Sequence, residues 1–109
     1  MVKGKIKEAI GLLGDFLNQK NISVDKVIVF GSQARGDTRR NSDIDIAIIS
    51  KDFEGKDIFE KTEMLKGLKW FLTERLLLSF DIVPLSFSEW NSSSLIAQFA
   101  KEGFEVSLS

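Results

Sequence analysis

The sequence contains neither cysteine nor histidine. The absence of cysteine excludes disulfide bonds and thiolate metal sites. The absence of histidine excludes the serine–histidine and cysteine–histidine catalytic pairs, together with the usual zinc ligands. Any catalysis by this chain must therefore use carboxylates, hydroxyls, lysine, arginine and backbone groups, and an assisting metal ion would be one that prefers oxygen ligands.

Strong charge of one sign and long hydrophobic runs are also lacking. The formal net charge is −1, which gives no electrostatic basis for binding nucleic acid or a membrane. No apolar run approaches the ~20 residues that span a bilayer. The N-terminal stretch MVKGKIKEAIGLLGDFL resembles a signal peptide, but Glu8 and Asp15 interrupt it and no cleavage site of small residues follows. We expect a cytoplasmic protein that contacts neither membranes nor nucleic acid directly.

Hydrophobic spacing predicts helices over about residues 5–18, 57–74 and 92–102. Ser92 or Ser93 is suited to cap the last helix, and Gly103 to end it. The 109 residues, of which 43% are hydrophobic and 28% charged, have room for one core. We therefore interpret residues 1–109 as a single domain.

Three strands are predicted between these helices. KVIVF, residues 26–30, is apolar at consecutive positions, as in a strand covered on both faces. SDIDIAII alternates isoleucine with aspartate or alanine, which indicates a strand with one apolar face. LLLSFDIVPL predicts a third strand at about residues 78–83, ended by Pro84, and FEVSLS predicts a short edge strand or a tail. This order of elements predicts an α/β (α+β) fold with a small mixed β-sheet flanked by helices.

Two carboxylates stand close together on the second predicted strand. Alternate side chains of a strand share a face, so the Cβ atoms of Asp43 and Asp45 are expected to lie roughly 6.6 Å apart. Two carboxylates at that distance raise each other's pKa unless a cation lies between them, and the strand itself contains no lysine or arginine. Mg²⁺ suits such a position because it binds one or two carboxylates together with substrate phosphates.

The loop before these carboxylates is suited to phosphates. Gly31 permits close approach of the backbone, Ser32 offers a hydroxyl and an N–H at the start of a helical turn, and Arg35 follows one turn later. The loop is not a P-loop, because Gly36 is followed by Asp37 rather than by lysine and a hydroxyl residue.

A third carboxylate lies in the third predicted strand. Asp81 is flanked by Phe80 and Ile82, where an unpaired buried carboxylate would be costly. If the third strand lies beside the second, Asp81 faces the same cavity as the first two carboxylates. Three carboxylates opposite a phosphate-binding turn are the components of a metal-assisted phosphoryl or nucleotidyl transfer site.

Each feature also has an interpretation without function. An isolated pair of aspartates is more often a solvated strand face, and Asp81 could be an edge residue with a water or lysine partner. Trp70, Phe71 and Trp90 are more often core than partner contacts. The combination of the glycine–serine turn, the aspartate pair and the later aspartate favours a site.

The combined motif resembles a known family. "GS", then ten residues (33–42), then "DID" resembles the signature of the nucleotidyltransferase superfamily with the DNA polymerase β-like fold. The form GSQARG…SDIDIAII with a late FDIV, in so short a chain, is most similar to the minimal nucleotidyltransferase branch. The resemblance implies that Gly31 and Ser32 hold the β- and γ-phosphates of a nucleoside triphosphate, and Arg35 matches an arginine common in this branch.

The resemblance also implies roles for the carboxylates. Asp43 and Asp45 would bind the metal ions, Mg²⁺ or Mn²⁺. Asp81 would ligate the catalytic metal and help to deprotonate the attacking hydroxyl. ATP would be the substrate.

Proteins of this branch are often encoded beside a HEPN-domain ribonuclease toxin and act as its antitoxin. The resemblance therefore implies an enzyme that transfers AMP to a hydroxyl, above all a tyrosine, of such a toxin within a hetero-oligomer. Two alternatives are an antitoxin that neutralises its partner by contact alone and a nucleotidyltransferase for a small molecule such as an aminoglycoside. The chain lacks the extra domain by which larger relatives bind an acceptor, which favours an acceptor brought by a partner.

Overall fold

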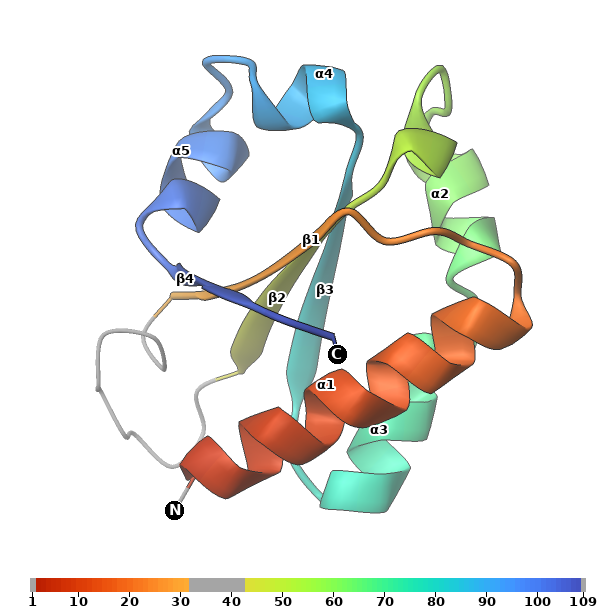
Figure 1. Cartoon of the computed structure of the whole chain (residues 1–109), viewed down its shortest axis with the longest axis vertical. Coiled ribbons are helices and arrows are strands. Elements are labelled where there is room, and N and C mark those ends of the chain that lie inside the picture. The colour runs from red at the N-terminus through yellow and green to blue at the C-terminus, as the bar shows by residue number, and fades with distance from the viewer. Residues whose placement is uncertain (1, 32–42, 109) are drawn as a thin grey trace.

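A four-stranded sheet lies between two layers of helices (Figure 1). The computed structural model describes residues 2–31 and 43–108, with the side chains of residues 2 and 3 not described. Helices α1 (Val2–Gln19) and α3 (Leu68–Leu76) cover one face of the sheet, and α4 (Phe87–Trp90) and α5 (Leu95–Lys101) cover the other. The predicted mixed sheet flanked by helices is confirmed.

The strands run in the order β3-β2-β1-β4. Strand β1 (Lys26–Phe30) is antiparallel to β2 (Ile44–Ile49) and to β4 (Phe104–Val106), whereas β2 is parallel to β3 (Phe80–Leu85). The prediction that residues 26–30 form a strand covered on both faces is confirmed, because Val27 to Phe30 are all buried. The C-terminal segment pairs with β1 as an edge strand.

The prediction of a single apolar face on β2 is wrong. Ile44, Ile46 and Ile48 are buried on the side of α1 and α3, as expected, but Ala47 and Ile49 are buried as well. They lie in the second core cluster, with residues of β1, β3 and α5. The second helical layer therefore covers most of this face and leaves only the first part of β2 open, where Asp45 lies half-buried.

The predicted helix over residues 57–74 is two helices, α2 (Ile58–Met64) and α3. The helical conformation is interrupted before α3 at Gly67, which has φ +91°, a left-handed conformation that favours glycine. Leu68 and Leu72 are buried as expected, but Trp70 is 69% exposed and does not belong to the core. The first helix, expected over residues 5–18, is confirmed and extends somewhat beyond both ends.

Pro84 lies inside β3 rather than ending it. Proline lacks the N–H that a ladder needs, but β3 is at the edge of the sheet, where an outward-facing N–H has no strand to bond. The last predicted helix begins later than expected, at Leu95, because Ser94 caps it by accepting a hydrogen bond from Ala97 N. Helix α4 has only four residues, too few to show a helical period in the sequence.

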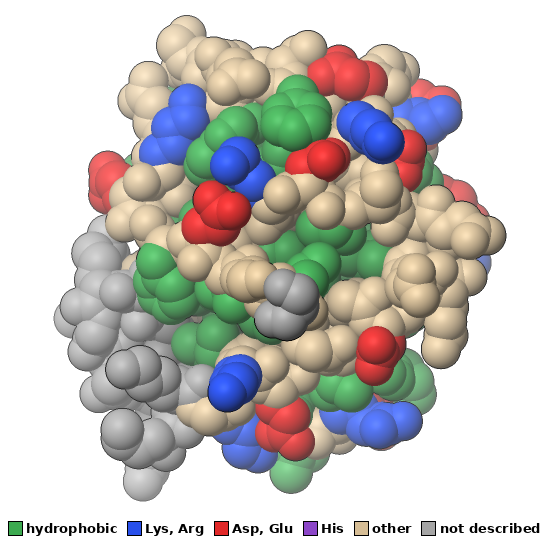
Figure 2. Space-filling model, in the orientation of Figure 1, with side chains coloured by type: hydrophobic (Ala, Val, Ile, Leu, Met, Phe, Trp, Pro, Cys, Tyr) green, Lys and Arg blue, Asp and Glu red, His purple; other side chains and the backbone are tan. Residues whose placement is uncertain are grey.

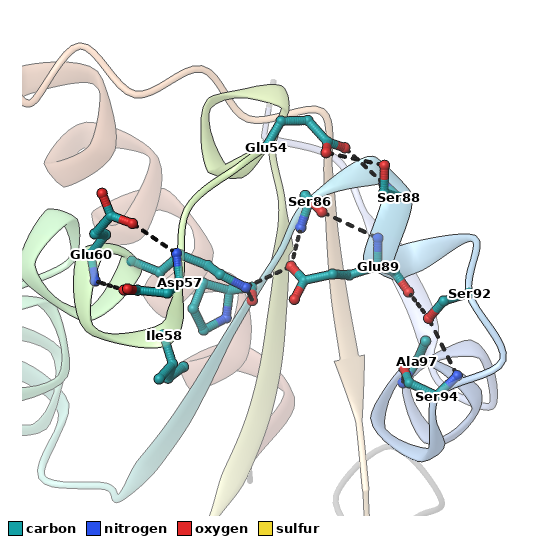
Figure 3. A network of polar contacts seen from close by, with 12 residues as sticks. Glu54, Asp57, Ile58, Glu60, Ser86, Ser88, Glu89, Ser92, Ser94 and Ala97 are labelled. Carbon is teal, nitrogen blue, oxygen red and sulfur yellow. Dashed lines mark hydrogen bonds and ion pairs between the residues drawn. The ribbon is translucent and has the colours of Figure 1, made fainter.

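A buried cation joins α2 to the second helical layer. The side chain of Lys61 is 5% exposed and lies 2.6 Å from Glu89 Oε1, and its Nζ also donates to Pro84 O at 3.4 Å. Figure 3 shows that Glu89 turns back over the start of α4, where its carboxylate accepts from Ser86 N at 2.9 Å. Burial raises the pKa of Glu89, but the hydrogen bonds from Lys61 and Ser86 outweigh burial and hold it below its usual range.

Replacing Glu89 with alanine is expected to lower the free energy of unfolding by about 2 kcal/mol. The reason is that Lys61 would remain as a buried charge without its carboxylate; fully buried pairs lose more, and Glu89 is 44% exposed. Lys61→Met, which removes the charge and keeps the apolar stem, should cost less than about 1 kcal/mol. Urea denaturation measures both, and equal losses would contradict this account of the pair.

The face seen in Figure 2 carries lysine, arginine and acidic side chains interspersed around patches of hydrophobic side chains, so charge of one sign does not dominate it. Among the described residues, no helix combines the length and the hydropathy that crossing a membrane requires.

Candidate active site

The sheet brings two of the predicted carboxylates side by side. In the parallel pairing of β2 with β3, Asp45 lies opposite Asp81, and in the antiparallel pairing of β1 with β2, Asp45 lies opposite Phe30. Phe30, Asp45 and Asp81 thus form one row across three strands, about 4.8 Å from strand to strand. The expectation that the third strand lies beside the second is confirmed, and both carboxylates face the layer of α4 and α5.

The two carboxylates line a cavity of about 330 Å³. It is lined by Phe30 at the end of β1, by Gly31 directly after it, and by Ile96 and Phe99 of α5. These two side chains are 39% and 54% exposed, so α5 presents apolar groups to the cavity rather than to the core. The sequence pattern marked them as helical apolar residues and gave no signal that they line the site.

Gly31 has two reasons to be glycine. Its φ of +79° is in the left-handed region. A Cβ at this position would collide with Asp45 Oδ2 and lie 3.1 Å from Asp45 Cγ. The end of β1 therefore approaches the carboxylate more closely than any side chain allows, which places the backbone of Gly31 and the carboxylate of Asp45 in one small site.

Gly31→Ala is expected to displace the Asp45 carboxylate and reduce nucleotidyl transfer by about 10²-fold, because a misplacement of about 1 Å at a reacting centre costs that much. The left-handed φ adds roughly 1–2 kcal/mol of destabilisation. Gly55→Ala is the matched control: its φ is +74°, but nothing lies within 4 Å of its added Cβ. If both variants lose similar stability and only Gly31→Ala loses transfer activity, the close contact between Gly31 and Asp45 is supported. If the two variants have equal transfer activity, this contact does not matter for catalysis and the prediction is contradicted.

Negative charge is concentrated at this end of the sheet. Burial, Asp81 and Asp43, in that order, raise the pKa of Asp45. Asp43, just before β2, and Asp81 are both exposed. In the described part of the chain, no ion pair links any of the three carboxylates to lysine or arginine. A bound cation would therefore reduce the repulsion among these carboxylates, which no lysine or arginine of the described residues neutralises.

The donor set fits a hard metal ion in chemistry but is incomplete by itself. All candidate donors are carboxylate oxygens, which Mg²⁺ and Mn²⁺ accept. Among residues 2–31 and 43–108, no group of three acidic side chains is arranged to hold a metal ion. The neighbouring pair Asp45 and Asp81 matches the usual protein contribution to a Mg²⁺ site, one or two carboxylates completed by substrate phosphates.

Two of the predicted nucleotide-binding residues, Ser32 and Arg35, lie outside the described residues. Their assignment to phosphate binding therefore stays a prediction. Gly31 and Asp43, which flank the segment that contains them, are described and border the carboxylate site.

Comparison with known proteins points to the same chemistry. Residues 12–105 match the family model described as "Nucleotidyltransferase domain". The chain is also 32% identical over 107 residues to a protein of Methanocaldococcus jannaschii named "Putative protein adenylyltransferase MJ0141", with 91% of this chain and 99% of that protein covered.

Two solved structures share the fold. One, described as a "putative nucleotidyltransferase" from Sulfolobus solfataricus, has a TM-score of 0.60 and 22% identity, covering 94% of this chain and 76% of that one. The other, described as a "toxin-antitoxin with AMP-PNP", has a TM-score of 0.64 and 26% identity, covering 91% of this chain and 70% of that one.

Proposed function

This chain belongs to the nucleotidyltransferase domain family, and from this we propose that it transfers AMP from ATP to a hydroxyl of a partner protein. The proposed partner is a HEPN-type ribonuclease toxin, which the transfer would neutralise within a hetero-oligomer. Two similarities support this assignment: the relative named as a protein adenylyltransferase, and the neighbour solved as a toxin–antitoxin assembly with an adenine nucleotide.

The observation that carries the proposal is the row in which Asp45 and Asp81 lie opposite each other, with Gly31 against Asp45. Gly31 and the turn after it would receive the phosphates, and Ser32 and Arg35 would complete their binding. Asp45 lies between Gly31 and Asp81, and it would hold the nucleotide in position. Asp81 would orient the attacking hydroxyl and accept its proton, because no histidine exists to act as base.

Mg²⁺ or Mn²⁺ would be held by Asp43, Asp45 and Asp81 together with the phosphates, and it would neutralise charge on the nucleotide and on the leaving pyrophosphate. The chain's own contribution is then positional. The carboxylates keep the α-phosphate within reach of the hydroxyl, and Ile96 and Phe99 of α5 exclude water from one side.

The acceptor must come from outside the chain if it is a tyrosine. The sequence contains no tyrosine, so tyrosine modification in cis is impossible. Incubation of the protein alone with ATP and Mg²⁺ should leave its intact mass unchanged.

The test is intact mass spectrometry of a candidate HEPN-type protein incubated with this protein, ATP and Mg²⁺. Mass increases of one or more AMP units, lost when Mg²⁺ is chelated, would support both the reaction and the donor. Neutralisation of the toxin without any mass increase would support binding by contact alone. The Asp43→Ala/Asp45→Ala variant separates these outcomes, because only an enzyme would lose its effect.

A further inference from the structure

A second, larger cavity opens along the free edge of β3. It has a volume of about 740 Å³ and lies between that edge and the α2–α3 corner, and we call it the β3-edge groove. Figure 1 shows that β3 borders the side of the sheet nearest α2. The residues of the groove used below are Gly67, Trp70, Thr73, Asp81, Ile82 and Pro84. A volume of this size is sufficient for a bound peptide segment or a small molecule.

The β3-edge groove is continuous with the carboxylate site. Asp81 lines both the groove and the smaller cavity that contains Gly31 and Asp45. A group that enters along the β3 edge therefore reaches Asp81 from the side opposite β1. The two cavities meet at the carboxylate that is proposed to accept the proton.

The order of strands decides which substrate enters from which side. In phosphoryl transfer the leaving group, the phosphorus and the attacking oxygen lie roughly in line. With the leaving pyrophosphate at Gly31, just after β1, and the α-phosphate near Asp45, on β2, the line leads to Asp81 on β3. The attacking hydroxyl thus approaches from the β3 side, and the nucleoside is left with the smaller cavity beside α5.

The lining of the groove suits a segment of protein with an aromatic or aliphatic side chain. Trp70 is 69% exposed and lines the groove, and exposed aromatic side chains in pockets are frequent anchors of protein partners. The break at Gly67 separates α2 from α3 beside this wall, and Trp70, in the first turn of α3, is exposed rather than packed in the core. The lining includes Lys66, Lys69 and Glu63, so the groove does not carry charge of one sign.

The strand edge also admits an extended backbone over a short length. Ser79 O and Leu85 O accept from Ile44 N and Ser50 N, so the odd-numbered residues of β3 direct their backbone groups toward β2. The backbone groups of Ile82 then face the groove. Pro84 has no N–H and its carbonyl accepts from Lys61, so this end of the edge is closed to a further strand. Pairing is therefore confined to the part of β3 nearest Asp81.

We infer that the β3-edge groove is the docking surface for an extended segment of the partner protein, the segment that carries the acceptor hydroxyl to Asp81. This inference rests on the proposed function for the identity of the occupant. It adds the place and the conformation of the bound segment: beside Ile82, with a side chain against Trp70.

The test uses nuclear magnetic resonance of the isotopically labelled full chain with two probes. The first is a blocked peptide with tyrosine between β-branched residues, and it should shift the resonances of Ile82, Thr73 and the Trp70 indole. The second is AMP-PNP with Mg²⁺, and it should shift Gly31 and Phe99. Thr73→Trp fills the groove and should remove the peptide shifts. Phe59→Trp adds the same side chain on α2 at a position 81% exposed outside the groove, and should retain them.

Three results would overturn the inference: peptide shifts on α5, no peptide shifts at the highest soluble concentration, or AMP-PNP shifts at the Trp70 indole. The last result would make the groove a nucleotide site. Failure of the proposed function is a separate result, since peptide binding does not require transfer. With an acceptor protein that takes up AMP, Thr73→Trp should raise the KM for that protein by about tenfold or more and leave the KM for ATP unchanged.

Discussion

Replacing Asp81 with asparagine is expected to reduce AMP transfer by about 10²–10⁴-fold, the usual contribution of a positioned general base. The amide keeps the shape of the side chain and cannot accept the proton of the attacking hydroxyl. Asp81 is exposed and lies on the β3 side of Asp45, whereas Gly31 lies on the β1 side. Nucleotide affinity, measured by calorimetry with AMP-PNP and Mg²⁺, should therefore change little.

Asp15→Asn is the matched control for this variant, because Asp15 is an exposed carboxylate on α1, against the opposite face of the sheet. It should retain full transfer. Full transfer by Asp81→Asn would refute the assignment of the base. Loss of nucleotide binding along with transfer would instead show that Asp81 serves mainly to hold the nucleotide–metal complex, with proton removal left to another group.

The sheet and its row of carboxylates could be predicted because short-range signals agree there. KVIVF and DIDIAII each carry a strand pattern that packing on both sides reinforces. The parallel register of β2 and β3 then follows from burying Ile46 and Ile82 on the same face, which also places Asp45 opposite Asp81. A shift of one residue in the pairing of β3 with β2 would have placed the two carboxylates on opposite faces of the sheet.

The wall of the site beside α5 could not be predicted, because the large apolar residues of this helix do not mark the face that packs on the sheet. The helix packs on the sheet through Ala97 and Ala100, which are fully buried, and Gly103 follows closely against the backbone of β1. Small residues allow the helix to approach the strands, so Ile96 and Phe99 are left facing the cavity. A search for regularly spaced large hydrophobic residues does not detect a packing face that, as in α5, consists of alanine.

The β3-edge groove could not be predicted from the sequence for a different reason. A continuous helical pattern over residues 57–74 gave no sign of a break, since one glycine in a helix costs only about 1 kcal/mol. Gly67 has a left-handed conformation, and Leu65 and Leu68 on either side of it are buried in the core. Trp70 was therefore expected in the core, whereas it lies at the groove.

Replacing Asp45 with asparagine is expected to abolish metal-dependent nucleotide binding and to reduce transfer by about 10²–10³-fold, several kcal/mol of lost charge stabilisation. The same change should leave the protein without nucleotide slightly more stable. Burial and the neighbouring carboxylates Asp81 and Asp43 raise the pKa of Asp45, so folding disfavours its ionised form at neutral pH. Removing that charge stabilises the fold by less than about 1 kcal/mol, because the group is only half-buried and solvent screens its charge.

Asp52 provides the matched control of opposite sign. Its carboxylate accepts from Ser23 N at 2.8 Å and from Ser23 Oγ at 3.0 Å, and these hydrogen bonds lower its pKa. Folding therefore favours the ionised form of Asp52, and Asp52→Asn should lower the melting temperature while transfer is retained. Asp45→Asn should raise the melting temperature in the absence of Mg²⁺ and nucleotide, and should no longer respond to their addition. A lower melting temperature for Asp45→Asn would mean that the carboxylate of Asp45 makes a favourable interaction in the free protein. That result would contradict the account in which the neighbouring carboxylates repel one another until a cation binds.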